Sequence, residues 1–370
     1  MARLNRLFCR RSWLKVAGVA ASSALIPAVV RSTSPVPHRR LGVALVGLGS
    51  YANSKLRPAL RETKLCRLAG VVTGSAKKGA AWAHHYDFSP NSVYHYDEMG
   101  RLADDPNIDI VYVVTPNALH AEHCIRAARA GKHVICEKPF TISVAEAEAV
   151  IAACDSAGVK LSLGYRLHFD PFHEVLRGMA VETDSGRFRK MNGALSFELR
   201  GNAWRATKTL AGGGPLMDLG IYVIQEACMA AGGVAPISVM ARQLPKLRPD
   251  RFVDVEETLE WKMDFPGGER CLGRTSYNES ANEFRAEGVD RWFELEPAFT
   301  STDLHGATHL GPLNFSPVNQ QARQMDAFAR CILEDRASIV SGAMGRRDMV
   351  IIEAIYRSMK SKVPVAVIDA

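Results

Sequence analysis

The sequence has few cysteines and no Cys-x-x-Cys pair. Eight cysteines occur in 370 residues, and seven of them lie beyond residue 30: Cys66, Cys124, Cys136, Cys154, Cys228, Cys271 and Cys331. An odd number without paired spacing does not fit a disulfide framework. These cysteines are therefore expected to be reduced and mostly buried, and no metal site is predicted.

The chain also lacks a basic excess outside its first 30 residues. The formal net charge is +7, but residues 1–30 carry five basic side chains and no acidic one, so removing them leaves +2. This distribution argues against a nucleic-acid partner. The sequence has no internal repeat and no low-complexity tract. Its 47% hydrophobic and 23% charged residues describe a soluble globular protein, and its length predicts two domains.

No apolar run is long enough to make a membrane anchor the favoured interpretation. The stretch at residues 16–30 is short for a bilayer and contains two serines and a proline,. It follows Arg10-Arg11, so residues 1–30 have the layout of an export signal, and the paired arginines resemble a twin-arginine signal. We therefore expect export of the folded protein to the periplasm, with residues 31–40 forming a short N-terminal arm.

A dinucleotide-binding motif follows the arm. The apolar run that begins at Leu41 leads into Gly-Leu-Gly-Ser-Tyr-Ala at residues 47–52, a G-x-G-x-x-A pattern. In such a motif Gly47 permits a tight turn, Gly49 lets the backbone approach a pyrophosphate, and Ala52 lets the helix pack against the strand. The phosphates would bind at the N-terminus of the next helix. Alone the pattern is weak, because glycines at strand ends are common.

The residues that follow place this motif in an alternating pattern of strands and helices. Strands are expected at residues 67–72, 108–114, 132–136 and 159–163, with helices at 77–85, 97–103, 118–130 and 144–157. Such alternation predicts an α/β fold in which residues 41–164 form a Rossmann domain with a doubly wound parallel sheet. Lys138, in Cys136-Glu137-Lys138-Pro139, emerges at the carboxyl end of a buried strand, where open α/β sheets bind ligands.

The end of the second strand indicates which nucleotide is bound. An Asp or Glu there would accept hydrogen bonds from the adenosine ribose of NAD, but residues 72–78 read Val-Thr-Gly-Ser-Ala-Lys-Lys. Ser75 can donate a hydrogen bond to a 2'-phosphate, and Lys77 or Lys78 can supply positive charge. NADP is therefore favoured over NAD. The alternative is that the two lysines only begin a solvated helix.

The second half, residues 165–370, has a different pattern. Several segments alternate apolar and polar residues, as antiparallel strands with one solvated face do. Strands are expected at 191–199, 237–244, 255–265, 271–277 and 292–295, and helices at 171–181, 218–231, 320–333 and 345–360. This predicts an α+β domain with a mostly antiparallel sheet.

Three side chains suggest a chemistry. Asp218 and Tyr222 are four residues apart, on one face of a predicted helix that follows a glycine-rich segment,. Oxidising a sugar hydroxyl requires a group that accepts the hydroxyl proton, and a tyrosinate can do this if a nearby ammonium favours the ionised form. We expect Lys138 to supply that charge while Asp218 anchors another hydroxyl. Taken alone, Asp218 and Tyr222 would be a helix-capping acid and a core aromatic.

These residues together resemble the Gfo/Idh/MocA oxidoreductase family, and most closely its glucose-fructose oxidoreductase branch. The resemblance rests on the motif at 47–52, Thr115-Pro116-Asn117-Ala118-Leu119-His120, the segment 131–139, Gly164-Tyr165-Arg166, and the glycine-rich segment through Asp218 and Tyr222. It spans nearly the whole chain after the leader. Many family members have histidine at the position of Tyr222, whereas the sugar oxidoreductase branch has tyrosine.

The resemblance implies a sugar oxidoreductase with non-dissociable NADP, which oxidises an aldose at C1 to its lactone and reduces a second sugar to an alditol. It also implies a large open sheet that supports a homodimer or a higher homo-oligomer. Lys138, Tyr222 and Asp218 would be catalytic, and substrate would contact Arg166, Tyr165, Trp204 and Arg205. Cofactor contacts would come from Gly47, Leu48, Gly49, Ser50, Tyr51, Ser75, Lys77, Lys78, Thr115, Pro116, Asn117, His120, Glu137, Lys138 and Arg166.

Several alternatives remain open. The segments at 187–204 and 297–319 look shorter than in glucose-fructose enzymes, so the acceptor sugar is an aldose or a ketose. An ordinary NADP-dependent aldose dehydrogenase would release NADPH instead of retaining it. An NAD-dependent glycosidase is less favoured, because its usual histidine signature is not seen. A non-catalytic sugar-binding module is disfavoured by Lys138, Asp218 and Tyr222 occurring together.

Overall fold

The structure of the protein is a computed structural model that describes residues 39–181, 187–201 and 204–368. The predicted signal peptide at 1–30 and most of the predicted arm lie outside these residues. Arg39 pairs with Asp109, and the Arg40 guanidinium donates to the carbonyl of Cys66 at 2.7 Å. These two arm residues therefore lie where the strands of the first sheet begin.

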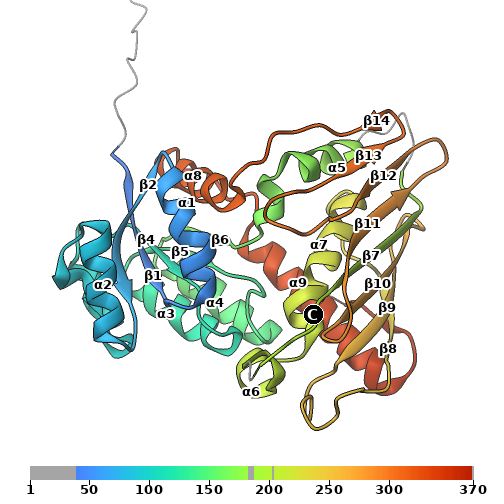
Figure 1. Ribbon diagram of the computed structural model, residues 1–370, viewed down its shortest axis with the longest axis horizontal. Helices are drawn as coiled ribbons and strands as arrows, with labels where there is room; N and C mark the ends of the chain where they lie inside the picture. The colour runs from blue at the N-terminus through green and yellow to red at the C-terminus, as the bar shows by residue number, and fades with distance from the viewer. Residues whose placement is uncertain (1–38, 182–186, 202–203, 369–370) are drawn as a thin grey trace, which may run out of the picture. The chain divides into compact units, whose positions relative to one another are not determined.

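The first sheet has six parallel strands in the order β3-β2-β1-β4-β5-β6. Figure 1 shows it in the N-terminal, blue to green part of the chain. The strands are β1 (Leu41–Val46), β2 (Cys66–Val72), β3 (Val93–Tyr94), β4 (Ile110–Val113), β5 (His133–Cys136) and β6 (Leu161–Leu163). This order is that of a doubly wound dinucleotide-binding sheet, so the predicted Rossmann domain is confirmed. The two-residue strand β3 was not predicted.

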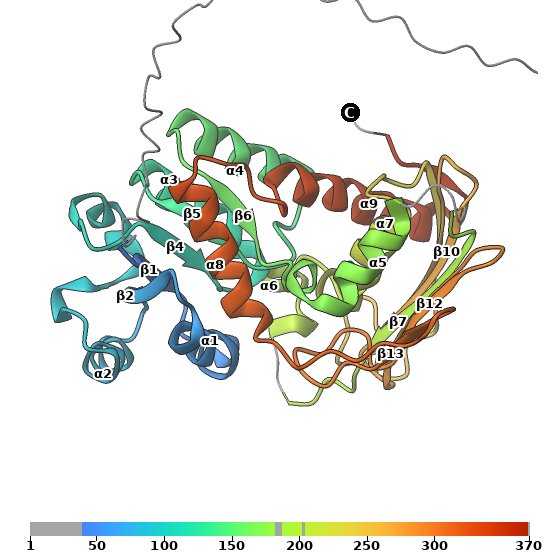
Figure 2. The ribbon, with the colours of Figure 1, turned by 90° about the horizontal axis from the view of Figure 1, so that it is seen from above.

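Helices cover both faces of this sheet, with α3 and α4 on one side and α1 and α2 on the other (Figure 2). They are α1 (Arg57–Glu62), α2 (Ala76–Tyr86), α3 (His120–Arg129) and α4 (Val144–Ser156). The predicted helix at 97–103 is a 3₁₀ helix, Tyr96–Asp104. Helix α8 (Gln320–Leu333) comes from the second half of the chain, yet Met325 and Phe328 pack in the core of this first sheet.

The second sheet has nine strands in the order β14-β13-β12-β11-β7-β10-β9-β8-β15, and every pair is antiparallel except β7 with β10. The mostly antiparallel sheet is thus confirmed. Its strands are β7 (Lys190–Ser196), β8 (Ser238–Gln243), β9 (Thr258–Asp264), β10 (Arg270–Ser276), β11 (Ala281–Glu287), β12 (Trp292–Leu295), β13 (Gly306–Thr308), β14 (Gly311–Pro312) and β15 (Val365–Ala366). The strands β11, β13, β14 and β15 were not predicted.

Helices α5 (Pro171–Val181), α7 (Ile221–Ala230) and α9 (Gly342–Ser361) lie on one side of this sheet (Figure 2). A π-helical turn, Leu216–Gly220, leads into α7, and α6 (Lys208–Ala211) precedes it. Helix α7 is apolar around most of its circumference because it is covered by the sheet and by α5 and α9,.

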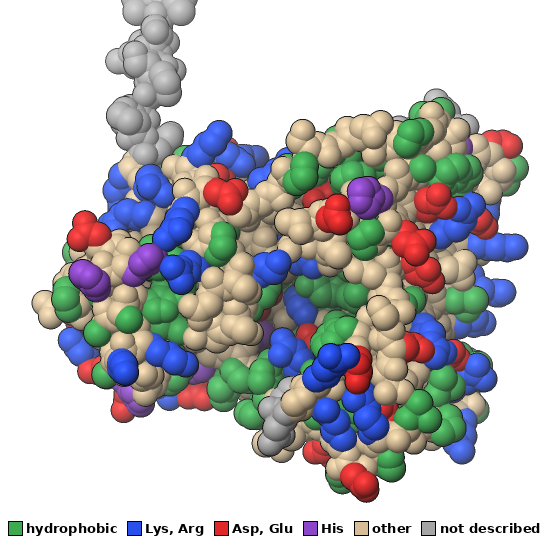
Figure 3. All heavy atoms as spheres, in the orientation of Figure 1, with side chains coloured by type: hydrophobic (Ala, Val, Ile, Leu, Met, Phe, Trp, Pro, Cys, Tyr) green, Lys and Arg blue, Asp and Glu red, His purple; other side chains and the backbone are tan. Residues whose placement is uncertain are grey.

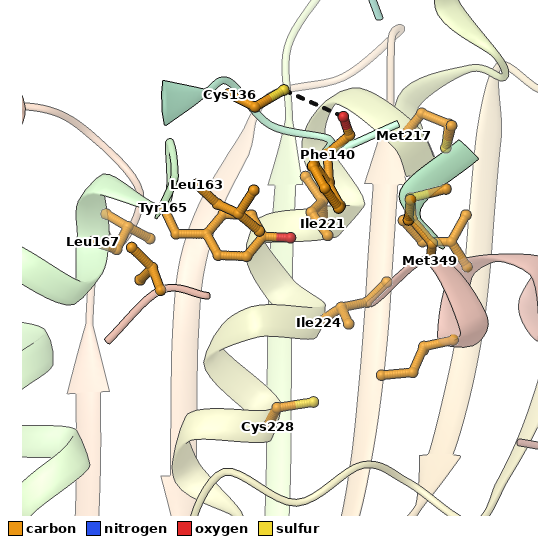
Figure 4. Packing of buried hydrophobic residues seen from close by; sticks show 14 of the residues in the cluster. Cys136, Phe140, Leu163, Tyr165, Leu167, Met217, Ile221, Ile224, Cys228 and Met349 are labelled. Carbon is orange, nitrogen blue, oxygen red and sulfur yellow. Dashed lines mark hydrogen bonds between the residues drawn. The ribbon is translucent and has the colours of Figure 1, made fainter. Parts of the chain in front are cut away.

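The main core joins both sheets and includes Phe140, Tyr165, Ile221 and Ile224, which Figure 4 shows around α7. The seven cysteines in the described residues are buried free thiols, as expected, and Cys136 donates to the carbonyl of Phe140 (Figure 4). Within the described residues, no helix combines the length and the apolar character that crossing a bilayer requires.

Candidate active site

A cleft of about 770 Å³ opens where the parallel strands end and extends to the start of α7. Figure 3 shows this cleft as a hollow between the helices and strands of the first sheet and those of the second sheet, with basic side chains in it. The position agrees with the rule that open α/β sheets bind ligands beyond the carboxyl ends of their strands.

The dinucleotide motif forms one wall of the cleft. Gly47 adopts a φ of +98°, and a β-carbon there would lie 3.0 Å from the carbonyl oxygen of Val114, so this turn requires glycine,. Gly49 has no atom within 4 Å of the space that a β-carbon would fill. Ala52 is fully buried against the sheet. The backbone at Gly49 is therefore open to a pyrophosphate at the start of a helix.

The adenosine end of the cleft is lined by Thr73, Gly74, Ser75, Lys78 and Tyr96. The Ser75 side chain caps α2 by accepting a hydrogen bond from the backbone N–H of Lys78 at 3.3 Å. Its hydroxyl hydrogen is free to donate to a phosphate oxygen. Lys78 lines the cleft and Lys77 does not, so only one of the two predicted lysines is placed to contact a 2'-phosphate.

The opposite end of the cleft contains a buried ion pair. The Lys138 ammonium donates to the Asp218 carboxylate at 3.0 Å and to the Asp218 carbonyl at 2.6 Å. Arg205 and the hydroxyl of Tyr277 bind the other carboxylate oxygen at 2.8 and 3.1 Å. Asp218 thus has four hydrogen-bonding contacts from residues that lie far apart in the sequence.

These contacts determine the charges at the site. Burial raises the pKa of Asp218, but Lys138 and Arg205 outweigh that effect and lower it to about 2,. Burial likewise lowers the pKa of Lys138, but the Asp218 carboxylate outweighs it and the pKa is raised. Both side chains are therefore charged at neutral pH.

Tyr222 lies beside two cations. The Lys138 ammonium is 4.9 Å from the centre of the Tyr222 ring, and the Arg166 guanidinium is 5.0 Å from it, which are cation–π distances. The ring of Phe299 lies 6.1 Å away. The expected meeting of Lys138, Asp218 and Tyr222 is therefore present, with the Lys138 hydrogen bonds directed to Asp218.

Arg166 stabilises the end of the cleft that contains Tyr222. Its guanidinium donates to the carbonyls of Phe299 and Thr300 at 2.6 and 2.9 Å and also to the side chain of Gln320. The residue is 6% exposed. It therefore fixes the loop that carries Phe299 over Tyr222, in addition to lining the cleft where substrate contact was predicted.

The glycine-rich segment before α7 packs against the protein itself. A β-carbon at Gly213 would overlap the Tyr356 hydroxyl, and one at Gly214 would overlap the Glu256 backbone. The Glu256 carboxylate accepts from the backbone N–H groups of Gly214 and Leu216 at 3.0 and 3.1 Å. The room that these glycines leave is thus occupied by Tyr356 and Glu256, which fix the start of the helix that carries Asp218 and Tyr222.

Other predicted residues hold the segments around the cleft together. The two ring nitrogens of His120 lie 2.8 and 2.9 Å from the carbonyls of Pro139 and Thr115. Asn117 donates to the carbonyl of Ala211 at 2.9 Å. Glu137 accepts from Tyr112 at 2.7 Å, and burial raises its pKa. A β-carbon at Gly164 would lie 2.8 Å from the Glu137 carboxyl, so this close approach requires glycine.

The structure brings nearly all predicted site residues to one cleft. Those that line it are Gly47, Leu48, Gly49, Ser50, Tyr51, Ser75, Lys78, Thr115, Pro116, Asn117, His120, Glu137, Lys138, Arg166, Trp204, Arg205, Asp218 and Tyr222. Two do not line it: Lys77, and Tyr165, whose 4%-exposed side chain lies in the core (Figure 4). The residues that the sequence did not indicate include Tyr96, Phe197, Tyr277 and Phe299.

Among the described residues, no cluster of three or more His, Cys, Asp or Glu side chains has the arrangement of a metal site. The open backbone at Gly49, the left-handed turn at Gly47 and the pair Ser75 and Lys78 instead fit a dinucleotide with a phosphorylated ribose.

Comparison with known proteins agrees with this fit. Residues 41–165 match the model of an oxidoreductase family with an NAD-binding Rossmann fold, and residues 174–295 match the GFO/IDH/MocA C-terminal domain. The structure resembles that of an aldose-aldose oxidoreductase from Caulobacter crescentus complexed with glycerol, with a TM-score of 0.83 and 36% sequence identity over 89% of this chain and 100% of that chain.

Two curated relatives are D-xylose 1-dehydrogenases (NADP+). The one from Haloarcula marismortui is 26% identical over 86% of this chain and 91% of its own length. The one from Haloferax volcanii is 30% identical over 87% of this chain and 96% of its own length. The chain therefore belongs to the Gfo/Idh/MocA family of oxidoreductases.

Proposed function

We propose that the protein is a sugar oxidoreductase that retains NADP, oxidises one aldose at C1 to its lactone and reduces a second sugar to an alditol. The observation that carries the proposal is the buried Lys138–Asp218 pair beside Tyr222, at the end of a cleft that begins with a dinucleotide motif. The likeness to an aldose-aldose oxidoreductase supports an aldose as the acceptor.

The residues along the cleft have distinct tasks in this proposal. The backbone around Gly49 would hold the pyrophosphate, and Ser75 and Lys78 would hold the 2'-phosphate. When bound, NADP would supply the hydride acceptor for C1 of one sugar and, in its reduced form, the hydride donor for a second sugar. Asn117 and His120 both line the cleft, and the His120 ring lies close to Lys138 because its Nδ1 is 2.8 Å from the carbonyl of Pro139.

The proton chemistry belongs to the other end of the cleft. Tyr222 accepts the proton of the C1 hydroxyl as the C1 hydride departs, and returns it when the second sugar is reduced. Lys138 holds positive charge next to the developing oxyanion, and Asp218 fixes Lys138 and Arg205 in place. Trp204 and Arg205 lie together, with the guanidinium 4.6 Å from the indole centre, and form a wall suited to a sugar ring.

The Tyr222→Phe variant tests this assignment. Because general acid–base catalysis contributes roughly 10²- to 10⁴-fold, sugar oxidation should fall by at least about a hundredfold while the nucleotide remains bound. Tyr86→Phe, on the half-buried face of α2 and outside the cleft, is the matched control. Turnover that survives in Tyr222→Phe would remove this tyrosine from the proton transfer.

A second candidate is an ordinary NADP-dependent aldose dehydrogenase that releases NADPH, which the two D-xylose dehydrogenase relatives favour. Denaturing the purified protein and measuring released nucleotide separates the two candidates. Near-stoichiometric NADP supports retention, and its absence favours the dehydrogenase. Incubating the protein with single aldoses and with aldose–ketose mixtures, without added cofactor, then identifies the acids and alditols formed.

We further propose export through the twin-arginine leader and self-association through the open face of the nine-stranded sheet. On that face Met240 is 44% exposed and Leu272 52% exposed, among strands with paired charges such as Arg274–Glu260. Light scattering should report a dimer or larger assembly that Leu272→Arg weakens. Changing Arg10 and Arg11 to lysine should keep the protein out of the periplasmic fraction.

A further inference from the structure

Two cations flank Tyr222, and the structure compensates their charges differently. The Lys138 ammonium donates to the carboxylate and to the carbonyl of Asp218, so an anion lies 3.0 Å from it. The Arg166 guanidinium, 5.0 Å from the centre of the Tyr222 ring, donates to two carbonyl oxygens and one amide oxygen. None of these hydrogen bonds between described residues goes to a carboxylate. Arg166 therefore keeps its positive charge available beside Tyr222.

The amide acceptor belongs to Gln320, the first residue of α8. Helix α8 packs against the turn Arg166–Phe169, and Gln320 is 0% exposed. Its amide oxygen accepts from Arg166, and its amide nitrogen donates to the Asp170 carboxylate at 2.8 Å and to the carbonyl of Thr300 at 3.2 Å. Only this orientation of the amide satisfies both neighbours, because a guanidinium only donates hydrogen bonds and an ionised carboxylate only accepts them.

Gln320 also keeps Arg166 apart from a buried anion. Burial raises the pKa of Asp170, but hydrogen bonds from His173 and Gln320 outweigh that effect and lower the pKa, so Asp170 is ionised at neutral pH. Its other carboxylate oxygen accepts from the backbone N–H of Phe172 at 3.0 Å. One amide side chain therefore separates the Asp170 carboxylate from the Arg166 guanidinium, and the guanidinium charge remains directed to the cleft.

The electrostatics of the site link Arg166 to Tyr222. Burial lowers the pKa of Arg166, but the ionised forms of Tyr222 and Tyr51, with a hydrogen bond to Tyr222, outweigh it and raise the pKa. For Lys138, burial lowers the pKa and Asp218 is the partner that opposes it most. Because the interaction between two charges is mutual, Arg166 favours the ionised form of Tyr222. Burial raises the pKa of Tyr51 well above its ordinary value, so Tyr51 stays a neutral hydroxyl.

We propose that Arg166 is a catalytic residue that stabilises ionised Tyr222, and that Gln320 is a positioning residue that holds Arg166 in place. This inference rests on the proposed function, in which the Tyr222 oxygen takes the proton of the C1 hydroxyl as the C1 hydride departs. Arg166 stays protonated throughout and takes up no proton itself. Its charge favours the proton acceptor, while Lys138, fixed by Asp218, serves the developing sugar oxyanion.

The ionisation of Tyr222 can be measured without turnover. Ultraviolet difference titration follows tyrosinate, and the signal that Tyr222→Phe removes belongs to Tyr222. In Arg166→Met this signal should appear about two pH units higher, the effect of losing a unit charge roughly 5 Å away in a partly buried site. The charged or titratable side chains around Tyr222 are Lys138, Arg166, Arg205, Asp218 and Tyr51. Arg205 has a side chain that is 34% exposed, so solvent screens its charge more strongly.

Kinetics separate the charge of Arg166 from its hydrogen bonds. Arg166→Met should lower kcat for aldose oxidation at neutral pH by about a hundredfold, and raising the pH should restore much of that loss. Arg166→Lys keeps the charge but not the planar fork of donors, so it should retain most of kcat while the KM for sugar rises. If Arg166→Lys loses kcat as fully as Arg166→Met, the charge is not the cause and the proposal is overturned.

Gln320→Met tests the positioning residue. Without the amide, Arg166 can turn to Asp170 and pair with it, so kcat should fall about tenfold and the tyrosinate signal should move to higher pH. The KM for sugar should hardly change, because Gln320 does not line the cleft. Gln324→Met is the matched control: Gln324 is also 0% exposed on α8, but its amide donates to Tyr112 at 2.9 Å. Equal effects of the two variants on the pH profile would overturn the role of Gln320.

The two kinds of measurement separate this inference from the proposed function. If Arg166→Met moves the tyrosinate signal but the wild-type protein oxidises no aldose, the proposed function fails and the link between Arg166 and Tyr222 stands. If aldoses are oxidised and the tyrosinate signal of Arg166→Met appears at the wild-type pH, the inference is overturned and the proposed function is unaffected.

Discussion

Replacing Asp218 by Asn removes the carboxylate that forms ion pairs with both Lys138 and Arg205. The size of the side chain hardly changes, so the variant isolates the charge. The pKa of Asp218 lies at about 2, against an ordinary value of 3.8. At about 1.4 kcal/mol per pKa unit, that difference corresponds to roughly 2.5 kcal/mol of folding free energy. Because the side chain is 11% exposed, little of this is lost to solvent screening.

The sign of this contribution fixes its pH dependence. The folded-state pKa is depressed, so the stabilisation is fully present above the unfolded pKa and is lost as pH falls through the folded pKa. Asp218→Asn should therefore be about 2.5 kcal/mol less stable than wild type at pH 7, and only about half of that gap should remain at pH 3.

Urea unfolding at pH 7, 5, 4 and 3, with tryptophan fluorescence as the signal, measures the gap. Asp348→Asn is an instructive control, because burial raises the pKa of Asp348 although Arg347 opposes it. Ionisation of Asp348 therefore destabilises the folded wild-type protein as pH rises above the unfolded pKa of this group. The stability difference between wild type and Asp348→Asn should be larger at pH 3 than at pH 7, which is opposite to the trend for Asp218→Asn. A gap for Asp218→Asn that is equal at pH 7 and pH 3 would refute the assigned charges.

Two further predictions concern the nucleotide and the glycine-rich segment. Lys78→Ala should weaken NADP binding relative to NAD by about tenfold, because one charge-assisted hydrogen bond is lost. Lys77→Ala is the control, because Lys77 lies outside the cleft, and it should leave NADP binding unchanged. Nucleotide titration of the protein after its nucleotide has been removed measures both variants, and equal effects would contradict the assignment of Lys78. Gly213→Ala should destabilise by about 1–3 kcal/mol because the new methyl overlaps Tyr356,, while Gly100→Ala, with open space around it, should be neutral or slightly stabilising in urea unfolding.

Much of the fold was predictable because its signals are local. The apolar runs of the parallel strands and the periodicity of α5 and α8 indicated those elements, and the structure gives α5 and α8 the predicted bounds. The motif at 47–52 and Lys138 could be placed on one sheet edge because parallel strands end together. That rule predicted that the dinucleotide-binding motif, Ser75 and Lys138 share one cleft, without any knowledge of side-chain positions.

Features that depend on distant contacts were not predictable. Strand β11 reads Ala-Asn-Glu-Phe-Arg-Ala-Glu, and its polar residues form a strand only because β7 and β12 pair with it. Tyr277 ends a predicted strand, but nothing local indicates that its hydroxyl reaches Asp218, 59 residues earlier. The packing of Tyr356 and Glu256 against the glycines at 213 and 214 was not predictable either, because both residues come from far along the chain.

The same distant contacts explain why the site has a fixed geometry. Lys138 follows strand β5 of the first sheet, whereas Asp218 lies in the turn that begins α7 under the second sheet. Separating these two walls would leave a buried charge without its partner, which costs about 3–5 kcal/mol. The walls are therefore held together at the Lys138–Asp218 pair, and Arg166 fixes the segment that carries Phe299 next to Tyr222. Because Arg166 binds the carbonyl of Phe299 at 2.6 Å, Arg166→Lys should loosen that segment and raise the KM for sugar more than it lowers kcat.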